Sequence, residues 1–155
     1  MTEKVNPGNQ DAAVYAAMRV GFRVDRDAST LPQTGAAEYF EVANGRVLAH
    51  FLGEVTVVIQ TQANATKLTH NPAAGASLDL CATLDISAAP VGVLYTLTGT
   101  VGDALVGGGQ AGGLGHPFVL GEGGIDLDCA AGNSGETKWT CWYVPLDDGA
   151  VVTAS

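Results

Sequence analysis

The chain has 155 residues, a length that fits one domain with its own hydrophobic core. Apolar residues make up 46% and charged residues 15%, with 21 glycines, which favours a β-rich fold and argues against a disordered chain. The net charge of −9 excludes a typical nucleic-acid-binding surface, which is basic. No stretch is apolar for the length of a membrane helix, and the polar first ten residues do not resemble a secretory signal, so we expect no membrane partner.

The charges are distributed unevenly along the chain. Residues 1–27 contain four cations and four anions, whereas the remaining residues contain three cations and twelve anions. An acidic body keeps copies of a protein soluble and apart, while a neutral leading segment is free to dock on another protein. Chance unevenness explains the same pattern, so the charge distribution alone does not decide the function.

The first predicted element is a strand over residues 14–24, in which apolar and polar residues alternate. An alternative for its Ala-rich start is a short helix capped by Asp11. Residues 26–35 then read as a loop. The apolar face of this strand comprises Val14, Ala16, Met18, Val20, Phe22 and Val24.

Short strands separated by turn residues follow along the rest of the chain. A tight turn is expected at Ala43–Gly45, a break at Gly53 and a glycine-rich loop over 102–116. About ten strands with turn signals every 8–12 residues are typical of a sandwich, a jelly roll or a barrel, and we find no helix and no internal repeat. The expected strands lie at 38–42, 46–52, 54–62, within 63–75, and at 77–86, 91–99, 117–120, 123–130, 137–145 and 150–154.

Two of these strands indicate where the cysteines lie. Alternation in 77–86 points Leu78, Leu80, Ala82, Leu84 and Ile86 inward, so Cys81 falls on the polar face, under a loop or in an interface. In the strand over 123–130, Cys129 points inward with its apolar neighbours. Three widely spaced cysteines without an export signal predict buried, reduced thiols, although a disulfide between two of them is an alternative.

The stretch KWTCWYVPLDDGA, residues 138–150, contains both tryptophans of the chain. On a strand, Trp139, Cys141 and Tyr143 share one face, and Trp142 lies on the other. Because both faces have an aromatic residue, we expect both to be covered, one by the core and the other by a second sheet or a neighbouring subunit.

Candidate chemical sites each have a simpler explanation. Asp147 and Asp148 precede Gly149, which is ordinary turn chemistry, because adjacent carboxylates rarely aim at one point. The three histidines lack the spacing of a zinc site. We therefore expect no enzyme activity, no cofactor and no metal. The acidic strand residues Asp79, Asp85, Asp126 and Asp128 are interpreted as a solvated polar face rather than a calcium site.

Three stretches of the sequence, 45–86, 92–99 and 125–154, resemble structural proteins encoded in the virion modules of tailed bacteriophages. The resemblance extends from about Phe40 to the end of the chain. It implies an all-β protein of one domain, a jelly-roll-like sandwich or barrel. Residues 1–38 would then form an extended N-terminal arm and the first strand, and residues 39–155 the sandwich.

The resemblance also implies a function, namely that of a capsid decoration or cement protein on the exterior of the virion, made in the cytoplasm of the bacterial host. The expected partners are the major capsid protein and two further copies of the chain, in a homotrimer. The alternatives are a tail or head–tail junction component, or a sandwich that binds a receptor or carbohydrate. The residues expected at these contacts are Arg19, Arg23, Arg26, Trp142 and Tyr143.

Overall fold

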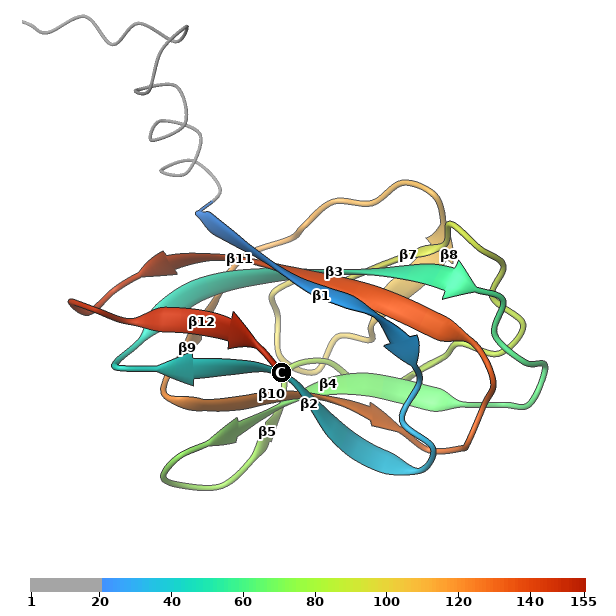
Figure 1. The fold of residues 1–155 in the computed structure, drawn as a ribbon, viewed down its shortest axis with the longest axis horizontal. Helices are drawn as coiled ribbons and strands as arrows, with labels where there is room; N and C mark the ends of the chain where they lie inside the picture. Colours follow the sequence, from blue (N-terminus) through green and yellow to red (C-terminus); the bar gives the residue numbers. More distant parts are fainter. Residues whose placement is uncertain (1–20) are drawn as a thin grey trace, which may run out of the picture.

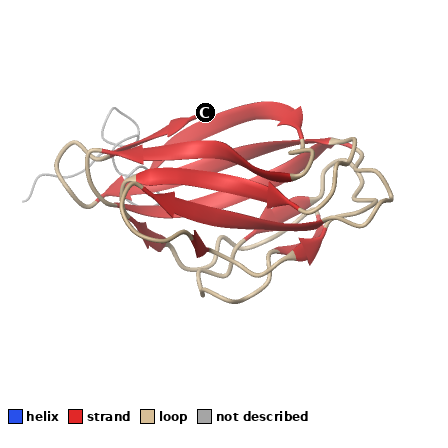
Figure 2. Ribbon diagram, turned by 90° about the horizontal axis from the view of Figure 1, so that it is seen from below, coloured by secondary structure: helices blue, strands red, loops and turns tan. Residues whose placement is uncertain are grey.

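Alternation of apolar and polar side chains governs the fold of residues 21–155, which are the residues that the computed structural model describes. They form two antiparallel sheets that pack face to face, and this part of the chain contains no helix (Figure 2). The predicted all-β sandwich is confirmed. The proposed N-terminal arm falls largely within residues 1–20, outside the described residues.

The first sheet, called sheet A here, has the strand order β1-β11-β3-β7-β8, and β9 pairs with β3 beside this path. All its pairs are antiparallel, and β11 lies between β1 and β3 (Figure 1). Its strands are β1 (Phe22–Thr30), β3 (Val47–Val57), β7 (Leu94–Thr96), β8 (Val106–Gly109), β9 (Phe118–Leu120) and β11 (Glu136–Pro145).

The second sheet, sheet B, has the order β12-β2-β10-β4-β5, and β6 also pairs with β4. Its edges are therefore β12 on one side and the two short strands β5 and β6 on the other. Its strands are β2 (Gly35–Ala43), β4 (Ala65–Pro72), β5 (Leu78–Asp79), β6 (Leu84–Asp85), β10 (Gly123–Cys129) and β12 (Val151–Ala154).

The chain is folded back on itself as one long antiparallel ribbon. Strand β1 pairs with β11, β2 with β10 and β3 with β9, so strands from the two ends of the sequence run beside each other. The first four strands alternate between sheets A and B, as do the last four. The ribbon is thus wound around the core, and each sheet contains strands from both halves of the chain.

The core fills the space between the inner faces of the two sheets. Its largest fully buried side chains include Trp139 from β11, Phe51 from β3 and Phe40 from β2. The rings of Phe40 and Phe51 lie 5.9 Å apart, which joins sheet B to sheet A at the centre of the sandwich. The prediction that Trp139, Cys141 and Tyr143 share one face is confirmed, and this face is the one that the core covers.

Residues 26–30 form part of β1, so the loop predicted from residue 26 onward was wrong there. The strand continues to Thr30 along β11, with a register shift between Arg26 and Ser29. Polar residues on an edge strand need no covering layer, and charges there discourage pairing with other chains. The polarity that suggested a loop is therefore that of an edge strand.

The single strand predicted over 77–86 was also wrong. The segment forms β5 and β6 against β4, and it leaves β4 only after Cys81, since the Leu80 amide still donates to Leu68 O at 2.9 Å. Ala82 makes a parallel bridge to Ala104, which interrupts the expected alternation, although Leu80 and Ile86 are buried as predicted. As a result, Leu78 is exposed and Cys81 belongs to the core, where its Sγ accepts a bond from the Leu68 amide at 3.4 Å. Ala82, predicted inward, is exposed.

Three further boundaries differ from the prediction. The expected break at Gly53 is absent, because β3 runs through it from Val47 to Val57. Strand β7 is shorter than predicted, and the glycine-rich region 102–116 contains β8. The tight turn at Ala43–Gly45 is confirmed, with positive φ at Asn44 and Gly45. All three cysteines are buried and unpaired, as predicted.

Gly53 continues β3 because the indole of Trp139 takes the space of a side chain. The two residues are opposite each other, and a Cβ on Gly53 would lie 2.6 Å from Cζ2 of the indole. We expect Gly53→Ala to lower the free energy of unfolding by about 1–3 kcal/mol through overpacking. Urea denaturation measures this. The control is Gly113→Ala, where no described atom lies within 4 Å and a change below about 0.5 kcal/mol is expected. Equal effects of the two substitutions would show that the indole moves aside.

Candidate docking surface

An apolar row crosses the outer face of sheet A. Leu48 on β3 lies opposite Val144 of β11 on one side and Val119 of β9 on the other. Val119 is 62% exposed and Val144 37%, while Leu48 between them is half-buried. Cross-strand neighbours on one face are close enough to contact each other. These three residues, called the apolar row below, therefore form a continuous surface on an acidic protein.

Trp142 lies beside this row, on the same outer face. Its neighbours across the strands are Arg23 of β1 and His50 of β3. The indole is half-buried, and Arg23 forms an exposed ion pair with Asp25 at 2.9 Å. Two of the predicted contact residues, Arg23 and Trp142, are thus brought together on this face.

The glycine-rich segment 110–116 limits the apolar row at one side, since it lies against sheet A itself. The carbonyl oxygen of Leu114 is 3.4 Å from Nδ1 of His50, and the amide of His116 donates to Thr98 O at 2.8 Å. A Cβ on Gly112 would lie 3.3 Å from the side chain of Thr96, which is buried although it is on the outer face. The segment covers β7 and the middle of β3, and leaves the row uncovered.

More apolar side chains gather at the end of sheet A where the row lies. Phe22 begins β1 opposite Tyr143, with the two ring centroids 5.7 Å apart, and Phe22 is largely exposed. Leu146, just beyond β11, is also exposed. The chain enters β1 at this end through Gly21, whose positive φ and close approach to Tyr143 O exclude a side chain. Residues 1–20 are therefore connected to the sandwich beside this surface.

The other predicted contact residues have different surroundings. Arg26 lies with its guanidinium 3.7 Å from the ring centroid of Tyr39, and its Nε donates to Ser155 O at 3.1 Å. Tyr143 is buried on the core face. Arg19 lies outside the described residues. The sequence could not reveal Leu48 or Val119 as contact candidates, since each is an ordinary strand residue until the register places them together.

The outer face of sheet B is acidic. Lys67 of β4 forms ion pairs with Asp79 at 2.7 Å and with Asp128 at 3.8 Å. Asp126 is 8% exposed, so the predicted solvated face is wrong at this position, and its carboxylate accepts a hydrogen bond from Asn71 Nδ2. Burial, followed by repulsion from Glu38, raises the pKa of Asp126 above its usual value.

The adjacent pair Asp147 and Asp148 lies in the turn before β12, as predicted. Both carboxylate oxygens of Asp147 bind Arg46: the guanidinium donates at 2.8 and 2.9 Å, and the backbone amide at 2.7 Å. These bonds hold the pKa of Asp147 far below its usual value. The carboxylate therefore fastens the turn before β3 to the turn after β11, which is a structural use.

Within residues 21–155, no three His, Cys, Asp or Glu side chains come together as a set of metal ligands. The same residues include no helix of the length and apolarity needed to cross a membrane. Comparisons of the chain with protein-family models, with curated proteins and with solved structures find no match.

The buried carboxyl of Asp126 predicts a pH dependence. Because its pKa is raised in the folded state, ionisation costs stability, and the loss develops as pH rises from the unfolded value through the folded value. We expect Asp126→Asn to raise the free energy of unfolding at pH 7 and to change it little at pH 3. The substituted amide still offers Asn71 an acceptor oxygen.

The matched control is Asp148→Asn, which removes the same charge from an exposed turn residue. Chemical denaturation of both variants at pH 3, 5 and 7 gives the comparison. If Asp126→Asn is less stable than Asp148→Asn at pH 7, the charged carboxylate stabilises the fold and the predicted sign is wrong.

Proposed function

We propose that this chain is a non-enzymatic structural protein of a bacteriophage virion, which decorates the capsid shell and docks on the major capsid protein through the apolar row. The row carries the proposal. It places Val144, Leu48 and Val119 side by side, two of them exposed, on the outer face of a sheet. Apolar patches that a monomer leaves exposed typically mark interaction sites with other molecules.

The charge of the chain suits a dock of this kind. The net charge of −9 opposes non-specific association, so the apolar row can stay exposed without causing aggregation. Arg23 and Trp142 border the row, and arginine and tryptophan are enriched in the centres of protein interfaces. The proposed partner surface is therefore apolar at its centre, with an acidic rim that meets Arg23.

The winding of the chain supports a jelly-roll arrangement, which is part of this proposal. Strand pairs β1·β11, β2·β10 and β3·β9 form one antiparallel ribbon that is wound into two sheets. Jelly rolls occur in viral capsid proteins and in lectins. The arrangement alone does not select a function, so the apolar row remains the main argument.

The proposed assembly is a homotrimer placed on three-fold positions of the shell. Closed cyclic oligomers match the local symmetry of a lattice. Three linked copies bind with far higher avidity than one, so a modest contact area in each copy is sufficient. The leading residues 1–20, which include Arg19 and join β1 beside the row, are proposed as the second contact of each copy.

A charge in the row tests the dock. We expect Val119→Glu to weaken binding to phage heads assembled without this chain by at least about tenfold, because the carboxylate would lose its water in the interface. Co-sedimentation of the purified chain with such heads measures the binding. The matched control is Val58→Glu, at an exposed valine beyond the far end of β3, which should bind as the unsubstituted chain does.

Equal binding of both variants would reject the row as the dock. Light scattering tests the trimer separately, because it gives the mass of the purified chain in solution at neutral pH with reductant. A trimer is the expected result. A ring of five, six or twelve copies would overturn the three-fold assembly and favour a vertex or tail position.

A further inference from the structure

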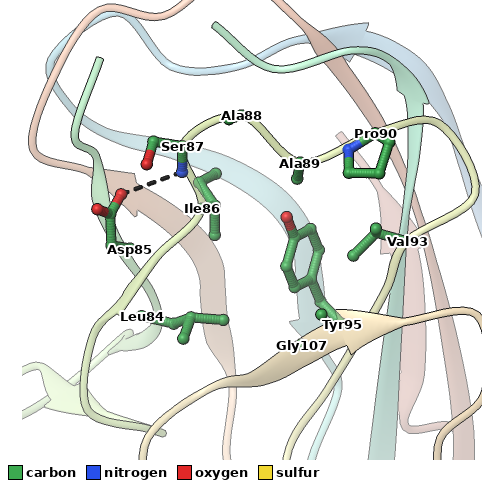
Figure 3. A pocket seen from close by; sticks show the side chains of 11 residues that line it. Leu84, Asp85, Ile86, Ser87, Ala88, Ala89, Pro90, Val93, Tyr95 and Gly107 are labelled. Carbon is green, nitrogen blue, oxygen red and sulfur yellow. Dashed lines mark hydrogen bonds between the residues drawn. The ribbon is translucent and has the colours of Figure 1, made fainter. Parts of the chain in front are cut away.

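A second surface feature lies at the edge of the sandwich formed by β8 of sheet A and β6 of sheet B. A pocket of ≈ 280 Å³ opens there between the two layers (Figure 3). It lies away from the apolar row, which is on the outer face of sheet A. Along β3, Leu48 of the row and Glu54, which pairs with β7 beside the pocket, are roughly 20 Å apart.

The pocket is lined mainly by apolar groups. The turn that follows β6 forms one wall, and β7 with β8 forms the other. Ala88 in this turn has a positive φ of 58°, and its amide donates to Gln60 O at 2.9 Å, which fixes the turn. The apolar side chains of the lining belong to Leu84, Ile86, Ala89, Pro90, Val93 and Tyr95.

Tyr95 places a hydroxyl at this pocket without a partner. The residue is 2% exposed, and its Oη makes no hydrogen bond with any of the described residues. Figure 3 shows the ring extending from β7 into the space beneath Ala89. Burial raises the pKa of Tyr95 to about 12, so the hydroxyl is protonated at neutral pH. A buried hydroxyl without a partner destabilises the fold, and a ligand bearing an acceptor can satisfy it.

A glycine opposite Tyr95 keeps room for the tyrosine ring. Thr96 pairs with Val106 and Leu94 with Gly109, so Gly107 and Gly108 both face Tyr95 in a bulge. A Cβ on Gly107 would lie 2.6 Å from the ring. Bulges of this kind are common at sheet edges and beside binding sites.

The rim of the pocket carries one negative charge. Asp85 Oδ1 accepts hydrogen bonds from the amides of Asn64 at 2.9 Å and Ser87 at 3.0 Å, which hold the carboxylate in place and its pKa below the usual value. Together with the acidic character of the chain, this charge disfavours anionic ligands.

We propose that this pocket binds an uncharged ligand group of about one aromatic ring, which carries an acceptor atom for the hydroxyl of Tyr95. Its size suits such a group, since an apolar cavity of about 150 Å³ already holds benzene. The lining packs against the ring, and the tyrosine hydroxyl sets its orientation. The same group can arrive on a free small molecule or on an aromatic side chain next to the carbonyl of a partner peptide.

Two probes of equal shape test the role of the hydroxyl. Acetophenone carries a carbonyl oxygen on its ring, and α-methylstyrene carries a methylene group in the same place. We expect chemical-shift titration to show that the unsubstituted chain binds acetophenone about tenfold more tightly than α-methylstyrene. The Tyr95→Phe variant should lose this preference. The shifts should centre on Val93, Tyr95 and Gly107. Benzoate should not bind.

The matched control is Tyr39→Phe, which removes a second buried hydroxyl from the core, where Tyr39 packs against Trp139. This variant should keep the preference of the unsubstituted chain. Ala89→Leu fills the pocket from its rim and should abolish the binding of both probes. It tests the site even if the tyrosine variant does not fold.

Two outcomes would overturn the proposal: binding of neither probe, or a preference that Tyr95→Phe leaves unchanged. A further probe, N-acetyl-phenylalanine amide, distinguishes the two sources of the ligand group. Tighter binding than that of acetophenone supports a partner's side chain, and weaker binding supports a free small molecule. Because the pocket is separate from the apolar row, a failure of the ligand proposal would leave the proposed capsid dock intact.

Discussion

The packing of Trp139 onto Gly53 is the constraint on which the rest of the sandwich depends. The indole lies across the backbone of β3, its Nε1 donates to Thr137 Oγ1 at 3.2 Å, and its edge meets Tyr39 of sheet B with ring centroids 6.4 Å apart. One side chain of β11 therefore fixes its own strand, the neighbouring strand and the opposite sheet. The glycine is required because a methyl group would occupy the position of the indole.

Sequence alternation predicted the interior well, because burial on one face imposes a period of two. The strands predicted over 123–130 and 137–145 are β10 and β11, each within one residue of the predicted bounds, and their inward residues are those expected, including Ile125 and Trp139. Alternation fails where a strand needs no covering layer, as in the polar end of β1, and where a segment changes partner, as at Cys81. It is also silent on register. Leu48, Val119 and Val144 are far apart in sequence, and only the pairing of β3 with β9 and β11 brings them together.

Because the inner faces of sheets A and B form the core, their outer faces are free to differ. That of sheet A carries the apolar row, and that of sheet B carries carboxylates partly neutralised by Lys67. The difference is consistent with the proposed docking on a shell. A protein that lies on a shell needs one face that loses water readily and another that stays hydrated, because apolar burial drives association while desolvation of carboxylates opposes it. The segment 110–116 covers the middle of sheet A, so that the apolar row stays uncovered at one end of this sheet.

The two open edges of the sandwich are closed differently, and the pockets that they leave differ in chemistry. At the edge between β1 and β12, Arg26 stacks on Tyr39 and donates to Ser155 O, so its long side chain bridges the two sheets. The pocket left at this edge is lined mostly by charged and polar residues, among them Asp25, Asp27 and Ser29. At the edge between β8 and β6, the corresponding strand offers Gly107 and Gly108, which have no side chain to fill it. A small side chain at a sheet edge normally costs packing energy. Here Gly107 accommodates the ring of Tyr95, and the pocket beside it is lined mainly by apolar groups, so this edge is the one that suits an uncharged ligand.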